Sequence, residues 1–127
     1  DALPAVDLRV KTNPNVAGTF SRVLGHYVRD TGLLTLSDGL ARMSLYQAQW
    51  LSQSSSSFYK KGRIQLGADA DIVIFDPMKV QANAAYGDPY QPPSGIPYVV
   101  VAGQIVVKNS VVVEGVYPGK RILGDAK

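Results

Sequence analysis

The sequence contains no cysteine and only one histidine among its 127 residues. Without cysteine, the chain forms no disulfide, no thiolate-ligated zinc site and no iron–sulfur cluster, and it has no thiol nucleophile. With one histidine, it cannot by itself supply a site that needs two imidazoles. These absences exclude several classes of metalloenzyme and all cysteine-dependent enzymes for the chain taken alone.

Charged residues are also few, at 18% of the chain, with a formal net charge of +3. The densest basic cluster contains Lys60, Lys61 and Arg63, and aromatic residues are not interleaved with these bases as they are in single-strand binders. We therefore expect a solvated basic face and no nucleic-acid partner.

No apolar run approaches the roughly 20 residues that a membrane-spanning helix needs. The first four residues, Asp1-Ala2-Leu3-Pro4, have neither the basic region nor the apolar region of a signal peptide. The sequence therefore predicts a cytoplasmic protein with no membrane partner. With 46% hydrophobic residues, the chain is too apolar for intrinsic disorder.

Residues 19–53 have the apolar spacing of helices. One helical face collects residues at i, i+3, i+4, i+7 and i+8, namely Phe20, Val23, Leu24, Tyr27 and Val28. Thr19 or Ser21 is expected to cap the start of this helix, and Gly32 follows its end. Two further helices are expected to open at N-cap serines, Ser37 and Ser44.

A run of polar residues, SQSSSS at 52–57, is expected to form a mobile surface linker. Beyond it the apolar period changes to two. A short strand is predicted at 72–75, and three β-branched runs split by tight turns predict an antiparallel meander over 98–113. The proline-rich interval 78–97 between them is expected to be a long irregular excursion, a feature that is often functional.

The helical part and the β part are each incomplete. Three short helices with one apolar face need a surface to cover, and four valine-rich strands need cover on both faces. A four-stranded sheet also has two open edges. We therefore expect both parts to belong to a larger structure.

Several segments carry a family pattern. Residues 61–76, KGRIQLGADADIVIFD, resemble a segment near the C-terminus of amidohydrolase-superfamily enzymes, and residues 95–107, GIPYVVVAGQIVV, are similar to the hairpin that follows it. Within the superfamily, residues 18–29, GTFSRVLGHYVR, resemble the N-acyl-D-amino-acid deacylase (D-aminoacylase) group. Residues 33–36, LLTL, and 86–89, YGDP, add to this similarity.

The resemblance implies a mixed α and β fold, with the C-terminal helices of a (β/α)8 TIM barrel followed by part of a composite β-sandwich. On this basis residues 1–53 are the last barrel loop and helices, residues 54–61 are a linker, and residues 62–127 are sandwich strands with the proline-rich excursion. It also implies a metal-dependent hydrolase acting on N-acyl amino acids, with zinc in the complete enzyme. The family's histidine, cysteine, glutamate or carboxylated-lysine ligands come from several barrel strands. None of them lies in this chain, so no cofactor is expected on this chain alone.

Asp1 is the one catalytic residue that the resemblance assigns. Asp1-Ala2-Leu3-Pro4 matches the family's [ST]-D-[GA]-x-P context at the end of the last barrel strand. This match makes Asp1 the general base, which takes a proton from water and passes it to the leaving amine. The same carboxylate is the chain's one candidate metal contact. The alternative is that Asp1 is an ordinary terminal residue with no strand to hold it.

No substrate-binding residues are assigned, because the sequence departs from the family pattern there. Relatives carry His-Pro-Arg-type residues before the GTF motif, where this sequence has TNPNVA at 12–17. The pattern M-T-x-x-P-A is present as MSLYQA at 43–48, without its proline. Lys11 and Arg22 are candidates to attract a substrate carboxylate, with ordinary surface charge as the alternative.

Three other features are expected to be structural. His26 lies between apolar positions of a helix, where a lone histidine is more often structural than a ligand. Asp71 precedes a strand and is expected to cap a turn rather than bind a metal. The serines at 54–57 have no histidine or aspartate placed to activate a nucleophile.

Two functions remain open from the sequence. The first is the C-terminal part of a metal-dependent amidohydrolase that hydrolyses the amide bond of N-acyl-D-amino acids or related amides. It would be inactive without the remaining barrel portion, because a hydrolytic metal needs about three protein ligands. The alternative is a non-catalytic β module or fragment that assembles with another copy of the chain through exposed strands.

Overall fold

The computed structural model describes residues 13–125, so the predictions for Asp1 and Lys11 fall outside the described residues. The chain divides into two compact units, Asp1–Leu36 with Phe75–Ile96 and Ser37–Ile74 with Pro97–Lys127. Each unit is built from two separate stretches of sequence. The compact units therefore do not coincide with the helical part and the β part expected from the sequence.

The first unit begins with one continuous helical stretch. α1 (Asn15–Arg22) runs directly into η1 (Val23–Asp30), a wider π-helical turn in which the Thr31 amide donates to the His26 carbonyl at 2.9 Å. The stretch ends, as predicted, just before Gly32, whose φ of +62° is a conformation that glycine adopts without strain.

This helical stretch starts earlier than predicted. The Asn13 side-chain oxygen accepts the Asn15 amide at 3.0 Å, and Pro14 has a helical φ of −58°. Thr19 and Ser21 lie inside the helix, where their hydroxyls donate to the carbonyls one turn before, at 2.7 and 3.1 Å. The prediction that Thr19 or Ser21 caps the helix was therefore wrong, because Asn13 already does so.

The other stretch of the first unit, residues 75–96, is closed on itself by backbone hydrogen bonds. The Asp76 amide donates to the Gly95 carbonyl at 2.9 Å, and Gln81 and Ser94 exchange two bonds at 3.1 and 3.2 Å. The predicted irregular excursion is thus a loop with a hydrogen-bonded neck.

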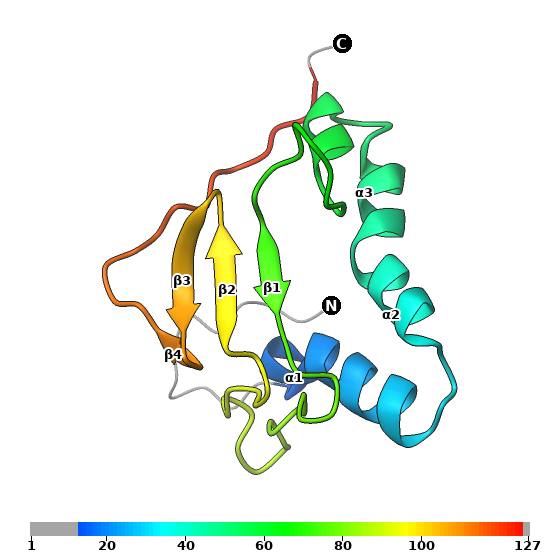
Figure 1. Cartoon of the computed structure of the whole chain (residues 1–127), viewed down its shortest axis with the longest axis vertical. Helices are drawn as coiled ribbons and strands as arrows, with labels where there is room; N and C mark the ends of the chain where they lie inside the picture. Colours follow the sequence, from blue (N-terminus) through cyan, green and yellow to red (C-terminus); the bar gives the residue numbers. More distant parts are fainter. Residues whose placement is uncertain (1–12, 126–127) are drawn as a thin grey trace. The chain divides into compact units, whose positions relative to one another are not determined.

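In the second unit, helices precede the sheet. α2 (Leu36–Met43) and α3 (Leu45–Leu51) follow one another across Ser44 (Figure 1). Ser37 lies inside the first turn of α2, so it does not cap that helix as predicted. Ser44 does precede α3, but its hydroxyl donates to the Leu40 carbonyl at 2.6 Å instead of accepting a helix amide.

The polar run expected to be a linker is folded. η2 (Ser56–Lys60), a short 3-10 helix, occupies most of the interval 54–61, and Ser55 is only 3% exposed. Most of the run lies at the surface, as predicted, but it is not an unstructured linker, because Ser55 and Ser56 bond to chain segments far away in the sequence.

The second unit carries a four-stranded antiparallel sheet in the order β1-β2-β3-β4 (Figure 1). The strands are β1 (Ile72–Ile74), β2 (Tyr98–Val101), β3 (Gln104–Lys108) and β4 (Val111–Val112). The predicted meander and the predicted strand before it are confirmed. Both hairpin turns use positive φ, at Ala102 (+48°) and Gly103 (+78°) and then at Asn109 (+54°) and Ser110 (+65°).

Few apolar side chains are buried. Among residues 13–125, the buried hydrophobic residues are Leu24, Ala48 and Val80. Large apolar side chains are exposed on both helices and strands, among them Phe20 (64%), Trp50 (69%) and Val112 (68%). The apolar faces that were predicted to need a cover are therefore open in the described chain.

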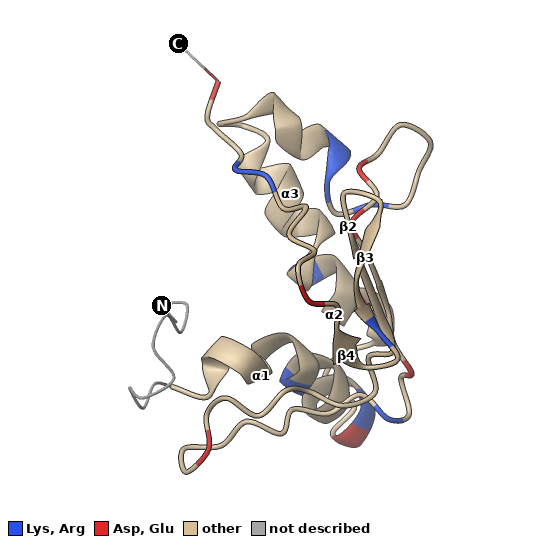
Figure 2. Cartoon of the chain, turned by 90° about the vertical axis from the view of Figure 1, so that its left-hand side faces the viewer, with Lys and Arg blue, Asp and Glu red and all other residues tan. Residues whose placement is uncertain are grey.

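Charged residues are spread thinly over the described ribbon. Figure 2 shows short stretches of Lys and Arg separated by long uncharged ones. Within residues 13–125, no helix is long and apolar enough to cross a bilayer.

Candidate functional site

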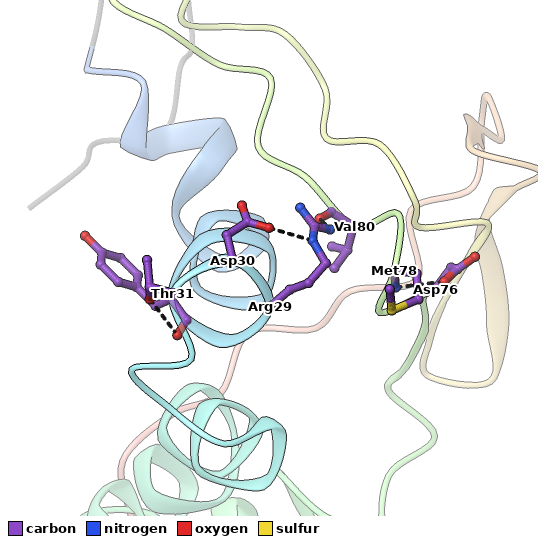
Figure 3. Close-up of polar contacts among 7 residues, drawn as sticks. Arg29, Asp30, Thr31, Asp76, Met78 and Val80 are labelled. Carbon is purple, nitrogen blue, oxygen red and sulfur yellow. Dashed lines mark hydrogen bonds and ion pairs between the residues drawn. The ribbon is translucent and has the colours of Figure 1, made fainter.

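The helix of the first unit binds the loop 75–96 through Arg29. The Arg29 guanidinium donates from Nη1 to the Val80 carbonyl at 2.7 Å and from Nε to the Asp30 carboxylate at 2.8 Å (Figure 3). Val80 is completely buried, so its carbonyl needs a partner from the protein. Arg29 supplies that partner and is itself held in place by Asp30.

Two glycines of the same helical stretch allow the loop to come close. A Cβ added at Gly25 would lie 2.6 Å from the Val80 carbonyl oxygen, a distance that real Cβ atoms do not reach. A Cβ at Gly18 would lie 3.5 Å from Ala82 and Ala84, which is ordinary contact. Gly25 is therefore required for close approach, whereas Gly18 only lies against the loop.

The loop is also shaped from its own side. The Asp76 carboxylate accepts the Met78 amide at 2.9 Å (Figure 3). The Asp76 carbonyl accepts the amides of Lys79 and Val80 at 3.0 and 2.8 Å. Gly95 has a φ of +76°, and a Cβ there would collide with the backbone of Lys79 and Val80. The Val80 carbonyl thus lies against Gly25 and accepts from Arg29, and the Val80 amide nitrogen lies against Gly95.

A small pocket of about 160 Å³ lies where η1 meets this loop. Its charged lining is Arg22, Arg29 and Asp30, with His26 beside them. The Arg22 guanidinium lies 5.9 Å from the centre of the Tyr27 ring, and the His26 ring meets the same tyrosine edge-on at 4.9 Å. Arg22, predicted as a candidate for attracting a carboxylate, therefore packs on an aromatic face at an exposed position.

The second unit has a charged cluster beside the sheet. The Lys61 ammonium pairs with the carboxylates of Asp69, at 3.0 Å, and of Asp71. The other Asp71 oxygen accepts the amide of Ala102, in the β2–β3 turn, at 2.8 Å. This confirms the prediction that Asp71 caps a turn.

The cluster changes the pKa values of Lys61 and Asp71. The hydrogen bond from Lys61 lowers the pKa of Asp71 most, and the amide of Ala102 lowers it further. The hydrogen bond to Asp71 raises the pKa of Lys61, with Asp69 adding to the shift against the opposing effect of burial. Both groups are therefore held in their charged forms, as a structural ion pair requires.

The described residues do not fit a metal ion. Over residues 13–125, no three histidine, aspartate or glutamate side chains come together in a group that could hold one. Asp69 and Asp71 pair with Lys61, and Asp71 also accepts the Ala102 amide in the hairpin turn. The exposed His26 contacts the Tyr27 ring. Asp1, the predicted general base, lies outside the described residues.

Comparison with known proteins shows the family of the chain. The model of the amidohydrolase family matches residues 10–107, which is more than half of the chain. The chain belongs to the amidohydrolase family. D-aminoacylase from Alcaligenes xylosoxydans xylosoxydans is 37% identical to it over 93 residues, which are 73% of this chain and 18% of that enzyme.

Solved structures of D-aminoacylase and of a related deacylase resemble this chain in three dimensions as well. A structure of D-aminoacylase, studied for its binuclear metal center, matches with a TM-score of 0.75 at 34% identity. The match covers 82% of this chain and 21% of the D-aminoacylase chain. N-acyl-D-glutamate deacylase from Bordetella bronchiseptica, complexed with zinc and a phosphonate inhibitor, has a TM-score of 0.70 at 38% identity. That likeness covers 76% of this chain and 19% of the deacylase.

Two of the segments that resemble the amidohydrolase family make contacts that hold the described part of the chain together. Gly25 and Arg29 of the GTFSRVLGHYVR segment hold Val80, and Asp71 of the KGRIQLGADADIVIFD segment holds the β2–β3 turn. Sequence reasoning missed the partners Val80 and Lys61, because neither has a feature of its own that signals the contact. The glycine at 25 inside an apolar helical face was the available signal of a close approach.

Proposed function

We propose that this chain is the C-terminal part of a metal-dependent amidohydrolase that hydrolyses the amide bond of N-acyl-D-amino acids or related amides. The observation that carries the proposal is the 37% identity to D-aminoacylase over 73% of the chain. A likeness of similar strength to an N-acyl-D-glutamate deacylase points to the same class of small-molecule substrate.

The chain spans about a fifth of the length of these relatives, 18% of D-aminoacylase. The open apolar faces, with three buried hydrophobic side chains in residues 13–125, support a role as one part of a larger core. In this proposal residues 1–53 form the last barrel loop and helices, 54–61 connect them to the next part, and 62–127 are strands of the composite β-sandwich.

A zinc centre in the complete enzyme would be held by residues that are not among those described here. The described residues supply no group that fits a metal, so no catalytic step through a metal is assigned to them. Asp1 is the chain's own proposed contribution to chemistry. Its carboxylate would accept a proton from the attacking water and return it to the departing amine.

A chimera tests this proposal. The segment of D-aminoacylase that corresponds to this chain is replaced by the chain, and zinc-dependent hydrolysis of N-acetyl-D-amino acids is measured. We expect the chain alone to be inactive and the chimera to be active, with Asp1→Ala lowering its rate about 10²–10⁴-fold, as for loss of a general base. Turnover by the chain alone would overturn the proposal, as would a folded, zinc-loaded chimera without activity.

The second candidate function is assembly without catalysis, and the exposed strands favour it. Val73 is 54% exposed on β1, and Val111 and Val112 on β4 are both 68% exposed, so both outer strands of the sheet present apolar surface. Sedimentation of the 127-residue chain separates the two candidates. A stable dimer whose mass drops on Val112→Lys, together with an inactive chimera, would favour assembly.

A further inference from the structure

The end of the described chain is anchored to the serine run at 54–56. The Ser55 hydroxyl donates to the Leu123 carbonyl at 2.7 Å, and the Asp125 amide donates to the Ser54 carbonyl at 3.1 Å. The Ser56 amide and hydroxyl donate to the two carboxylate oxygens of Asp125 at 2.8 and 3.2 Å. We name these four contacts, between residues 54–56 and 123–125, the C-terminal clasp.

The clasp fixes the first residue of a helix. Ser56 opens η2, and its amide has its partner in Asp125, which lies 69 positions later in the sequence. No side chain next to η2 caps it. A carboxylate at this end of a helix satisfies an amide and faces the positive end of the helix dipole, so η2 depends on Asp125 for its start.

The clasp also buries a polar side chain. Ser55 is 3% exposed, and its hydroxyl is satisfied by the Leu123 carbonyl. If residues 123–125 leave, the Ser55 hydroxyl and the Ser56 amide lose their partners together. Leu123 and Asp125 are only two residues apart, so one of these contacts is not expected to break while the other stays. The four contacts are therefore expected to form and break as one.

The segment leading into the clasp forms one wall of an open groove. This groove of about 940 Å³ is lined by residues 119–125 together with Lys61, Asp69, Asp71 and the β2–β3 turn. Residues 119–125 have no regular structure, and the hydrogen bonds that fix them are those of the clasp. Opening the clasp removes that wall from the groove.

We propose that residues 119–125 are a strap that docks and releases as a unit on Ser54–Ser56, and that its docking both folds η2 and closes one side of the groove over Lys61. Asp125 is the residue that latches the strap. This inference concerns the conformation of the chain and does not depend on the hydrolytic activity proposed above.

Hydrogen exchange of the 127-residue chain tests the strap. In Asp125→Ala, we expect the amides of 56–60 and of residue 125 to exchange about tenfold faster or more, since a charge-assisted hydrogen bond and its coupled contacts are lost, while β2 and β3 keep their rates. The matched control is Glu114→Ala, which removes an exposed acid from the same unit. Unchanged exchange in Asp125→Ala would overturn the proposal, as would equal acceleration in Glu114→Ala.

Cross-linking gives a second measurement that does not need the clasp to be broken. The chain has no cysteine, so Ser54→Cys with Gly124→Cys introduces the only two thiols and keeps the atoms of all four contacts, because Ser54 takes part only through its carbonyl and a Cβ at Gly124 meets it at an ordinary 3.5 Å. A short thiol-to-thiol reagent is expected to join them within one chain, whereas Ser54→Cys with Glu114→Cys stays unjoined. Failure of the first pair to react, or equal reaction of both pairs, contradicts a docked strap.

Discussion

Arg29 donates a hydrogen bond to the carbonyl of Val80, 51 positions later in the sequence, at 2.7 Å. Val80 is fully buried, so this bond satisfies a carbonyl that water does not reach. The contact connects the helical stretch at 15–30 to the loop at 75–96, the two stretches that share the first compact unit.

Replacing Arg29 by methionine is expected to destabilise the chain. Arg29→Met keeps much of the aliphatic stem but leaves the Val80 carbonyl without its partner, at a cost of about 1–3 kcal/mol in the free energy of unfolding. The measurement is urea denaturation followed by circular dichroism. Arg42→Met, on the exposed face of α2, is the control and should change the free energy by less than about 0.5 kcal/mol.

Two alanine substitutions on one helical stretch are expected to differ in their effect on stability. Gly25→Ala would place a Cβ 2.6 Å from the Val80 carbonyl and should destabilise the chain by about 1–3 kcal/mol, as overpacking does. Gly18→Ala meets only ordinary contacts at 3.5 Å and should be neutral or stabilise by up to about 1 kcal/mol, because alanine favours a helix over glycine. Equal effects in thermal unfolding would show that the close approach at Gly25 is not a constraint.

The ion pair of Asp71 and Lys61 is expected to give two pH limits. Because the folded pKa of Asp71 is lowered, its stabilising effect is present above the unfolded value of about 3.9 and is lost as the pH falls through the folded pKa. The raised pKa of Lys61 gives an effect that is present below about 10.4 and is lost as the pH rises through the folded pKa.

Asp71→Asn tests these limits. Both side chains are partly exposed, so the substitution should cost only about 0.2–1 kcal/mol at neutral pH, and the difference from the unchanged chain should vanish at acidic pH. Denaturation at a series of pH values measures this. A difference that stays constant down to pH of about 2 would contradict a role for the Asp71 charge.

The two hairpin turns offer a matched pair of substitutions. Ala102 has a φ of +48°, which asparagine tolerates better than alanine, so Ala102→Asn should stabilise the chain by up to about 1 kcal/mol. Asn109→Ala should destabilise it, because Asn109 has a φ of +54° and accepts a hydrogen bond from the Tyr98 hydroxyl at 2.9 Å. Melting temperatures that move in the same direction would contradict this account.

The elements that the sequence predicted well are those with a local signal. The β-branched runs and their turn residues predicted β2, β3 and β4, and Gly32 marked the end of the helical stretch. Asp71 before an apolar run predicted a turn cap, and Ala102 is the partner that the structure assigns. The contacts that decide the hairpins and the helix end are local, whereas Asp71 meets Ala102 31 positions later, so only its role as a cap could be predicted and not its partner.

Predictions failed where the deciding partner is far away in the sequence. The serines at 54–57 have the composition of a linker, but contacts with Leu123 and Asp125, far away in the sequence, add to local backbone bonds to give them structure. One failure was local instead: Asn13 and Pro14 have the composition of a loop, yet the Asn13 side chain accepts the Asn15 amide two residues later and α1 starts there. The catalytic prediction for Asp1 stays a prediction, to be decided by the chimera.

The hydrogen-bonded neck of the loop at 75–96 has a consequence for the order of folding. β1 ends at Ile74 and β2 begins at Tyr98, so their pairing must close the long loop between them, and the entropic cost of closure grows with loop length. The bond from Asp76 to Gly95 joins the ends of that loop two residues from β1. If this neck forms first, only residue 75 and residues 96–97 separate it from the first β1–β2 pair, Ile74 with Tyr98. The neck can therefore act as the point from which the pairing of β1 with β2 begins.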